Sequence, residues 1–62
     1  MYQVKIERHE YETGLNRHKA VSFQAHVEDE YGTWIEEAPV RDTWDQANDD
    51  ARLMREALRE RR

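Results

Sequence analysis

The sequence predicts an α+β protein of βββα order: a three-stranded antiparallel β-meander with one carboxyl-terminal helix packed on one face. Two observations lead to this prediction. The first half of the chain alternates apolar and polar residues with a period of two, which is typical of half-buried strands. The last third repeats its apolar residues at spacings of three and four, which is typical of an amphipathic helix. At 62 residues the chain has room for one domain, residues 1–62.

Strands are expected over about residues 2–11, 19–28 and 33–38, the last ended by Pro39, which lacks an amide donor. The apolar residues of the first two strands lie at every second position: Tyr2, Val4, Ile6, Val21, Phe23, Ala25 and Val27. Because glycine and asparagine tolerate a positive φ, residues 13–16 predict the hairpin loop. A four-residue loop there gives the pairs Tyr2 with Val27, Val4 with Ala25 and Ile6 with Phe23.

The turn at residues 29–32 leaves two pairings of the third strand open. A three-residue loop with Gly32 left-handed places Val27 opposite Ile35, whereas a four-residue loop places Val27 opposite Trp34. Neighbouring strand residues point to opposite faces. One of Trp34 and Ile35 is therefore expected on the face away from the helix.

The helix is expected over about residues 43–60. Asp42 or Thr43 can cap its amino end, and Asp45 in the first turn suits the helix dipole. Its apolar stripe is Trp44, Ala47, Ala51, Met54 and Leu58. We expect one core between sheet and helix that contains Val4, Ile6, Phe23, Trp44, Ala47, Met54 and Leu58.

The composition argues against several classes of protein. A domain of this size buries only about 60% of its unfolded surface, so a deep catalytic cleft is not expected. No nucleophile has a histidine predicted beside it, so we expect no enzyme, no catalytic residues and no cofactor. The three histidines, His9, His18 and His26, lie too far apart in the hairpin to bind zinc and are expected on the solvated surface.

The chain has no cysteine, which fits a reducing compartment. It also has no apolar run long enough for a membrane span or the core of a signal peptide. We therefore expect a cytoplasmic protein without a membrane partner.

Charge is strongly segregated along the chain. The segment from Glu28 to Asp50 holds nine of the 14 acidic residues and one basic residue, although the whole chain carries a net charge of only −4. Such segregation concerns partners more than fold. One interpretation is a solvated face that keeps the protein soluble. The other is an acidic surface that binds a basic partner protein, with these residues: Glu28, Asp29, Trp34, Glu36, Glu37, Asp42 and Asp45.

The alternative partner is nucleic acid. One helical face carries Arg52, Arg55, Arg59 and Arg62. The acids Asp49 and Glu56 can neutralise some of these arginines on the helix surface, and a pI near 5.3 lacks the usual basic footprint. Leu53 lies away from the apolar stripe and is interpreted either as an ordinary exposed residue or as a contact with a partner or a second copy in a homodimer.

The helix opens on Asp42-Thr43-Trp44-Asp45-Gln46-Ala47, followed by Ala51 and Ala57-Leu58. This opening, with the βββα order, resembles the partially degraded RNase-H-like module of HicB-type antitoxins. In size and charge the chain is also similar to small acidic phage inhibitors, including anti-CRISPR proteins. Both resemblances imply a protein that binds and neutralises another protein. The acidic surface itself suggests a partner with a basic groove, one that otherwise holds nucleic acid.

Overall fold

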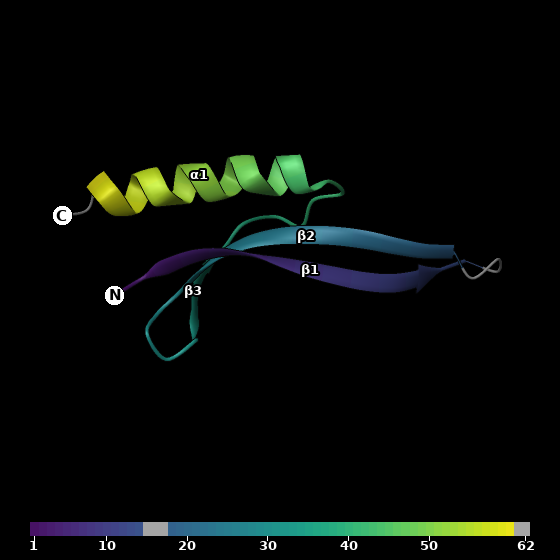
Figure 1. Ribbon diagram of the computed structural model, residues 1–62, viewed down its shortest axis with the longest axis horizontal. Coiled ribbons are helices and arrows are strands. Elements are labelled where there is room, and N and C mark those ends of the chain that lie inside the picture. The colour runs from purple at the N-terminus through teal and green to yellow at the C-terminus, as the bar shows by residue number, and fades with distance from the viewer. Residues whose placement is uncertain (15–17, 61–62) are drawn as a thin grey trace.

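The computed structural model describes residues 1–14 and 18–60 and confirms the βββα order. Its elements are β1 (Gln3–Thr13), β2 (His18–Glu28), β3 (Trp34–Glu37) and α1 (Trp44–Glu60). The strands form one antiparallel sheet in the order β1-β2-β3, so β2 is central and the other two are edges. Figure 1 shows α1 above the sheet, with β3 and its turn below the plane of the β1-β2 hairpin.

The hairpin register differs from the expected one by two residues. The observed pairs run from Gln3 opposite Glu28, through Val4 opposite Val27 and Ile6 opposite Ala25, to Thr13 opposite His18. The expected register was wrong because Thr13 still belongs to β1, and the left-handed turn begins only at Gly14, with φ 73°. The expected loop residues Leu15 and Asn16 lie outside the described residues. Since the shift is two, every side chain keeps its face.

A β-bulge separates β2 from β3. The pairs are His26 with Glu37, Val27 with Glu36 and Glu28 with Trp34. Ile35 is the additional residue, so both pairings expected for Val27 were wrong. Trp34 stacks on His26, on the face away from α1, while Ile35 lines a hollow with Val27 and Leu58. The bulge therefore lets both bulky neighbours make apolar contacts, on opposite sides of the sheet.

The chain after β3 continues along the outer side of β2. The Ala38 amide donates to the Ala25 carbonyl at 2.9 Å, and Phe23 and Arg41 exchange two backbone hydrogen bonds of 2.8 and 2.7 Å. Gln24 Nε2 donates to the Ala38 carbonyl at 2.9 Å. This connection fixes where α1 begins relative to the hairpin.

Thr43 is the residue that caps α1. Its Oγ1 accepts a hydrogen bond from the Gln46 amide at 3.2 Å, which satisfies one of the free donors of the first turn. Asp45 lies in the first turn and Arg59 in the last, as the helix dipole favours.

The fully buried core is smaller than expected. Its apolar members, 1% exposed or less, are Ala25, Val27, Ala47 and Ala51. The other expected members are only half-buried: Val4, Ile6, Phe23, Met54 and Leu58. Trp44 was wrongly placed in the core, since it is 50% exposed at the start of α1. The alanines bring α1 close to the sheet, so large side chains are confined to the flanks of the contact.

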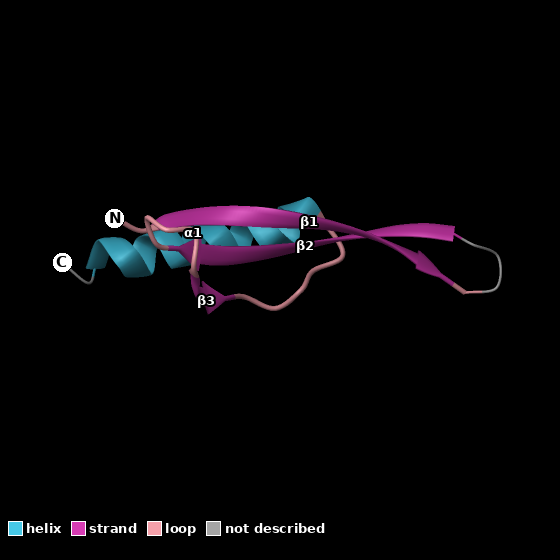
Figure 2. Cartoon of the chain, turned by 90° about the horizontal axis from the view of Figure 1, so that it is seen from below, coloured by secondary structure: helices cyan, strands magenta, loops and turns pink. Residues whose placement is uncertain are grey.

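The hairpin extends well past the helix (Figures 1 and 2). An 11-residue strand spans about 37 Å at 3.4 Å per residue, whereas the 17 residues of α1 span about 26 Å. The molecule measures 49 × 23 × 11 Å with a radius of gyration of 13.6 Å. A compact chain of this length would have about 10.6 Å. The half of the hairpin nearest the β1-β2 loop therefore lacks a covering layer within the described residues.

The alanine contact predicts sensitivity to overpacking. Replacing Ala51 by leucine should cost about 1–3 kcal/mol of unfolding free energy, because Ala51 is fully buried and three more carbon atoms would overpack the contact. Urea denaturation followed by circular dichroism measures this cost. As the matched control, Leu53→Ala on the exposed face should change the unfolding free energy by less than about 0.5 kcal/mol. Equal stability of Ala51→Leu and the parent would show that α1 does not pack closely at this position.

Candidate functional site

The residues predicted to bind a partner divide into two groups in the structure. Glu28, Asp29 and Trp34 make internal contacts that shape the sheet and its second turn. Glu37, Asp42 and Asp45 are exposed, and Glu36 is half-buried and takes part in an internal interaction. The predicted surface is therefore only partly available to a partner.

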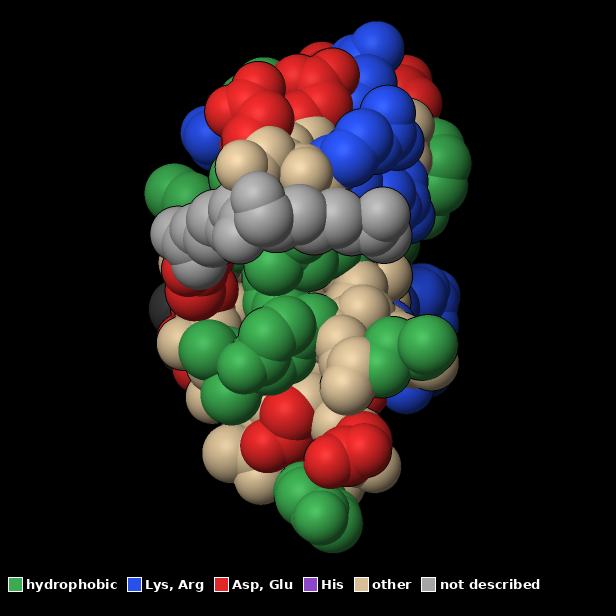
Figure 3. All heavy atoms as spheres, turned by 90° about the vertical axis from the view of Figure 1, so that its left-hand side faces the viewer, with side chains coloured by type: hydrophobic (Ala, Val, Ile, Leu, Met, Phe, Trp, Pro, Cys, Tyr) green, Lys and Arg blue, Asp and Glu red, His purple; other side chains and the backbone are tan. Residues whose placement is uncertain are grey.

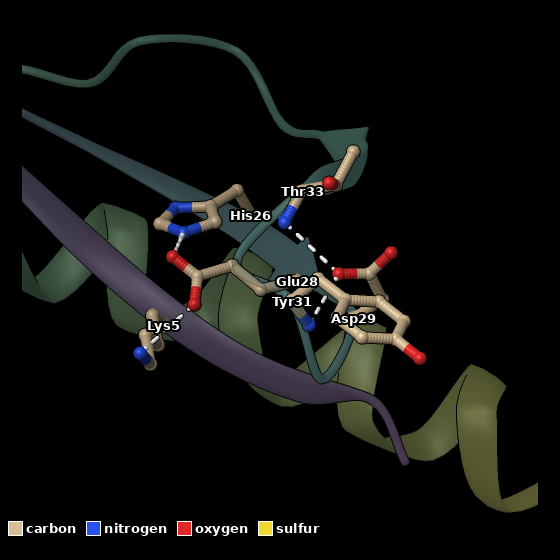
Figure 4. A network of polar contacts seen from close by, with 6 residues as sticks. All are labelled: Lys5, His26, Glu28, Asp29, Tyr31 and Thr33. Atoms are coloured by element: carbon tan, nitrogen blue, oxygen red, sulfur yellow. Dashed lines mark hydrogen bonds and ion pairs between the residues drawn. The ribbon is translucent and has the colours of Figure 1, made fainter.

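The first internal cluster surrounds His26, which is 1% exposed (Figure 4). Trp34 stacks on its ring with centroids 3.7 Å apart and planes 9° from parallel. Its Nε2 lies 2.9 Å from Glu28 Oε1, while Nδ1 is buried without a hydrogen-bond partner among the described residues. The expectation of a solvated imidazole was wrong for His26 because the bulged β3 turns beneath the sheet and covers it.

Glu28 joins this cluster to β1. Its Oε2 lies 2.8 Å from Lys5 Nζ, and its side chain is only 15% exposed. The hydrogen bonds from Lys5 and then from His26 hold the pKa of Glu28 below its ordinary value. Glu28 is thus a structural carboxylate with one partner on β1 and one on β2.

Asp29 has a different structural role in the turn between β2 and β3. Its Oδ1 accepts hydrogen bonds from the amides of Tyr31 and Thr33, each at 2.9 Å (Figure 4). The Gly32 amide donates to the Asp29 carbonyl at 3.2 Å, and Gly32 has a φ of 81°. A carboxylate that accepts from amides further along the chain is typical of an Asx turn. The left-handed Gly32 expected for this turn is confirmed.

Arg41, the one base within the acidic segment, anchors the connection to the helix. Its Nε and NH2 groups donate to the two carboxylate oxygens of Asp50 at 2.8 and 3.2 Å. Asp50 raises the pKa of Arg41 through these hydrogen bonds. The pair neutralises one acid of α1 and positions the start of the helix beside β2.

Four other exposed acids belong to the segment from Glu28 to Asp50. We call Glu30, Glu37, Asp42 and Asp45 the acidic edge. They come from the β2-β3 turn, from β3 and from the entrance to α1. Within residues 1–14 and 18–60 their side-chain carboxylates make no hydrogen bond or ion pair. Two exposed apolar side chains, Val40 and Trp44, alternate with these acids along the chain.

The predicted arginine face is also divided. Arg52 pairs with Asp49 on the helix surface, and Arg62 lies outside the described residues. Arg55 and Arg59 are exposed and line a hollow with Tyr2, Val4 and Leu58, beside the start of β1. Figure 3 looks at this end of the molecule and shows blue basic side chains mainly on one flank of a green apolar area, with red acidic side chains above, below and on the other flank.

In the described part of the chain, no three histidine or acidic side chains converge as metal ligands would. His9 lies opposite Ser22, and His26 lies opposite Lys5. No helix there has the length and apolar character needed to cross a membrane.

Comparisons with protein-family models, curated proteins and solved structures found no match to this chain. The resemblance to HicB-type antitoxins and to anti-CRISPR proteins stays a prediction. Neither the contacts of His26 nor the hollow beside Tyr2 was predicted from the sequence. Tyr2 and Leu58 were recognised as apolar residues in the sequence. Because the expected register was wrong by two residues, the residues around them were not predicted.

The Glu28 cluster generates a pH-dependent prediction. Near neutral pH, Glu28→Gln should lower the stability because the ion pair with Lys5 and the charged acceptor for His26 are lost. The folded-state pKa of Glu28 is depressed, so its contribution is fully present above the ordinary value of 4.5 and disappears as the pH falls through the folded value. Urea midpoints of variant and parent should therefore differ near pH 7, and the difference should shrink as the pH is lowered below 4.5.

The matched control is Glu30→Gln in the exposed turn. It should leave the urea midpoint almost unchanged at both pH values, because exposed acids contribute little to stability. A Glu28→Gln protein that is as stable as its parent near neutral pH would contradict the role given to this cluster.

Proposed function

We propose that the protein is a small non-enzymatic binding protein, an inhibitor whose acidic edge docks on a basic surface of a partner protein. The observation that supports the proposal is the acidic edge itself: four exposed carboxylates from three elements, without neutralising partners among the described residues. Exposed acids of this kind add little to stability. Carboxylates that are exposed and unpaired are available for an electrostatic contact.

Val40 and Trp44 give this surface an apolar component. They are 58% and 50% exposed and alternate with Glu37, Asp42 and Asp45 along the chain. Interfaces derive most of their energy from a few desolvated aromatic or large side chains, surrounded by polar groups that exclude water. Trp44 replaces Trp34 as the proposed anchor, because Trp34 is already stacked on His26.

The charge of the edge suggests the chemistry of the partner. A row of carboxylates presents negative charges to a basic groove, much as a nucleic-acid backbone does. The proposed partner is therefore a cytoplasmic protein that handles nucleic acid. Direct nucleic-acid binding through Arg55 and Arg59 is the alternative, since both are exposed and unpaired within the described residues.

The test is an affinity pull-down from the native cell extract, followed by kinetic measurements on the captured partner. Reversing Glu37 and Asp42 to lysine should slow association about tenfold or more, with little effect on folding. Binding by the parent should also weaken as salt shortens the Debye length, about 8 Å at physiological ionic strength. Trp44→Ala should mainly accelerate dissociation.

The matched control is Glu56→Lys with Glu60→Lys, which makes the same change in charge on α1, outside the acidic edge. This variant should bind the partner at nearly the parental rate. Binding that survives reversal of Glu37 and Asp42 but is lost in Arg55→Glu with Arg59→Glu would overturn the proposal in favour of nucleic-acid binding through the arginines.

A further inference from the structure

The outer edge of β1 is a long strand without a neighbour. Gln3–Thr13 contains no proline and pairs with β2 without a bulge over all 11 residues. Every second residue therefore directs its backbone amide and carbonyl away from β2, where no strand lies in the described part of the chain. The opposite edge is different, because β3 has only four residues, contains a bulge and is soon followed by Pro39. Of the two edges, β1 is the one open to a further strand.

The helix-side face of β1 has two unlike halves. Near Gln3 it is covered by α1, which begins close to Phe23, opposite Arg8, and runs back toward the amino end of β1. Beyond Arg8 the same face carries Glu10 and Glu12 with no helix above them. An apolar neighbour, Val21 on β2, lies opposite Glu10 and is half-buried.

The charges beside β1 differ between the two halves, although Lys19 on β2 lies opposite Glu12. At the covered half, Arg55 and Arg59 project from α1 beside Tyr2 and Val4. Arg8 forms an ion pair with Glu10 at 2.6 Å and is thereby neutralised near the middle of the strand. The distal acid Glu12 is exposed and has no ion pair among the described residues. One strand edge therefore has a basic flank at one end and acids at the other, on the same face.

We propose that β1 pairs antiparallel with β1 of a second copy, about a two-fold axis at Arg8, to form a continuous six-stranded sheet. An axis perpendicular to the sheet reverses the second strand and keeps both helices on one face. It places Ile6 opposite Glu10, Val4 opposite Glu12, Lys5 opposite Tyr11 and Glu7 opposite His9 of the second copy. Arg55 and Arg59 of each copy then face the two distal acids of the other.

This arrangement also explains the elongated shape of the single chain. The uncovered half of each hairpin lies beside the helix-covered half of its partner, so the two helices occupy diagonal positions on one face. The occupant is a second copy because Arg55 and Arg59 lie beside Val4, which the reversed β1 of a second copy places opposite the exposed Glu12. Glu37 of the acidic edge lies on β3, at the edge of the sheet opposite β1, and none of the four acids belongs to β1, so the inference is independent of the proposed function.

Charge reversal in two separate variants tests the inference. Sedimentation velocity and light scattering of the full chain should give twice the 7.5 kDa mass of one chain, with a concentration-dependent equilibrium. The Glu10→Arg/Glu12→Arg variant should self-associate about a hundredfold or more weakly, because arginines would then face arginines. The Arg55→Glu/Arg59→Glu variant should behave likewise, with acids facing acids.

A mixture of the two variants should restore the dimer as a heterodimer, since both ends of the interface then join opposite charges. The Glu30→Arg/Glu37→Arg variant is the matched control: it changes the net charge as Glu10→Arg/Glu12→Arg does, but on the acidic edge, and should stay dimeric. Circular dichroism shows that each variant is folded. A parent that sediments as one chain at every concentration, or folded variants that do not recombine, would overturn the proposal.

Discussion

The close packing of α1 on β2 through alanine is the contact on which the rest of the structure depends. Ala47 and Ala51 on the helix and Ala25 on the sheet are completely buried, and such small side chains allow the two layers to pack closely. The large apolar side chains are displaced to the flanks of this contact. That displacement explains why a chain with a thin core exposes Tyr2 and Trp44 at opposite ends of its helix.

The central strand connects this core to both candidate surfaces. β2 is hydrogen-bonded on one side along its whole length and on the other only as far as Phe23, where Arg41 closes the connection. The helix start and the acidic edge are therefore set by the same backbone bonds. On the other side, the helix-covered half of β1 receives Arg55 and Arg59. The unpaired arginines thus lie beside β1, whereas Glu37 lies on β3 at the opposite edge of the sheet.

The elements could be predicted from the sequence because each depends on local periodicity and on capping by residues such as Thr43. The hairpin register was missed by two residues, since a loop that starts at Thr13 and one that starts at Gly14 satisfy the same alternation. The bulge at Ile35 could not be predicted either. The sequence shows two bulky neighbours, Trp34 and Ile35, but not which of them pairs with β2 and which is the additional residue. The burial of His26 follows from that bulge, so it could not be predicted from the sequence.

The stack of Trp34 on His26 gives the protein a built-in optical reporter. The chain has two tryptophans, and their surroundings differ: Trp34 lies against an imidazole beneath the sheet, whereas Trp44 is half-exposed to water among carboxylates. Indole emission responds to polarity and to nearby quenching groups. A protein with only Trp34 would report by fluorescence on the closure of β3 over the sheet. One with only Trp44 would report on events at the acidic edge, so the two processes can be followed separately in the same molecule.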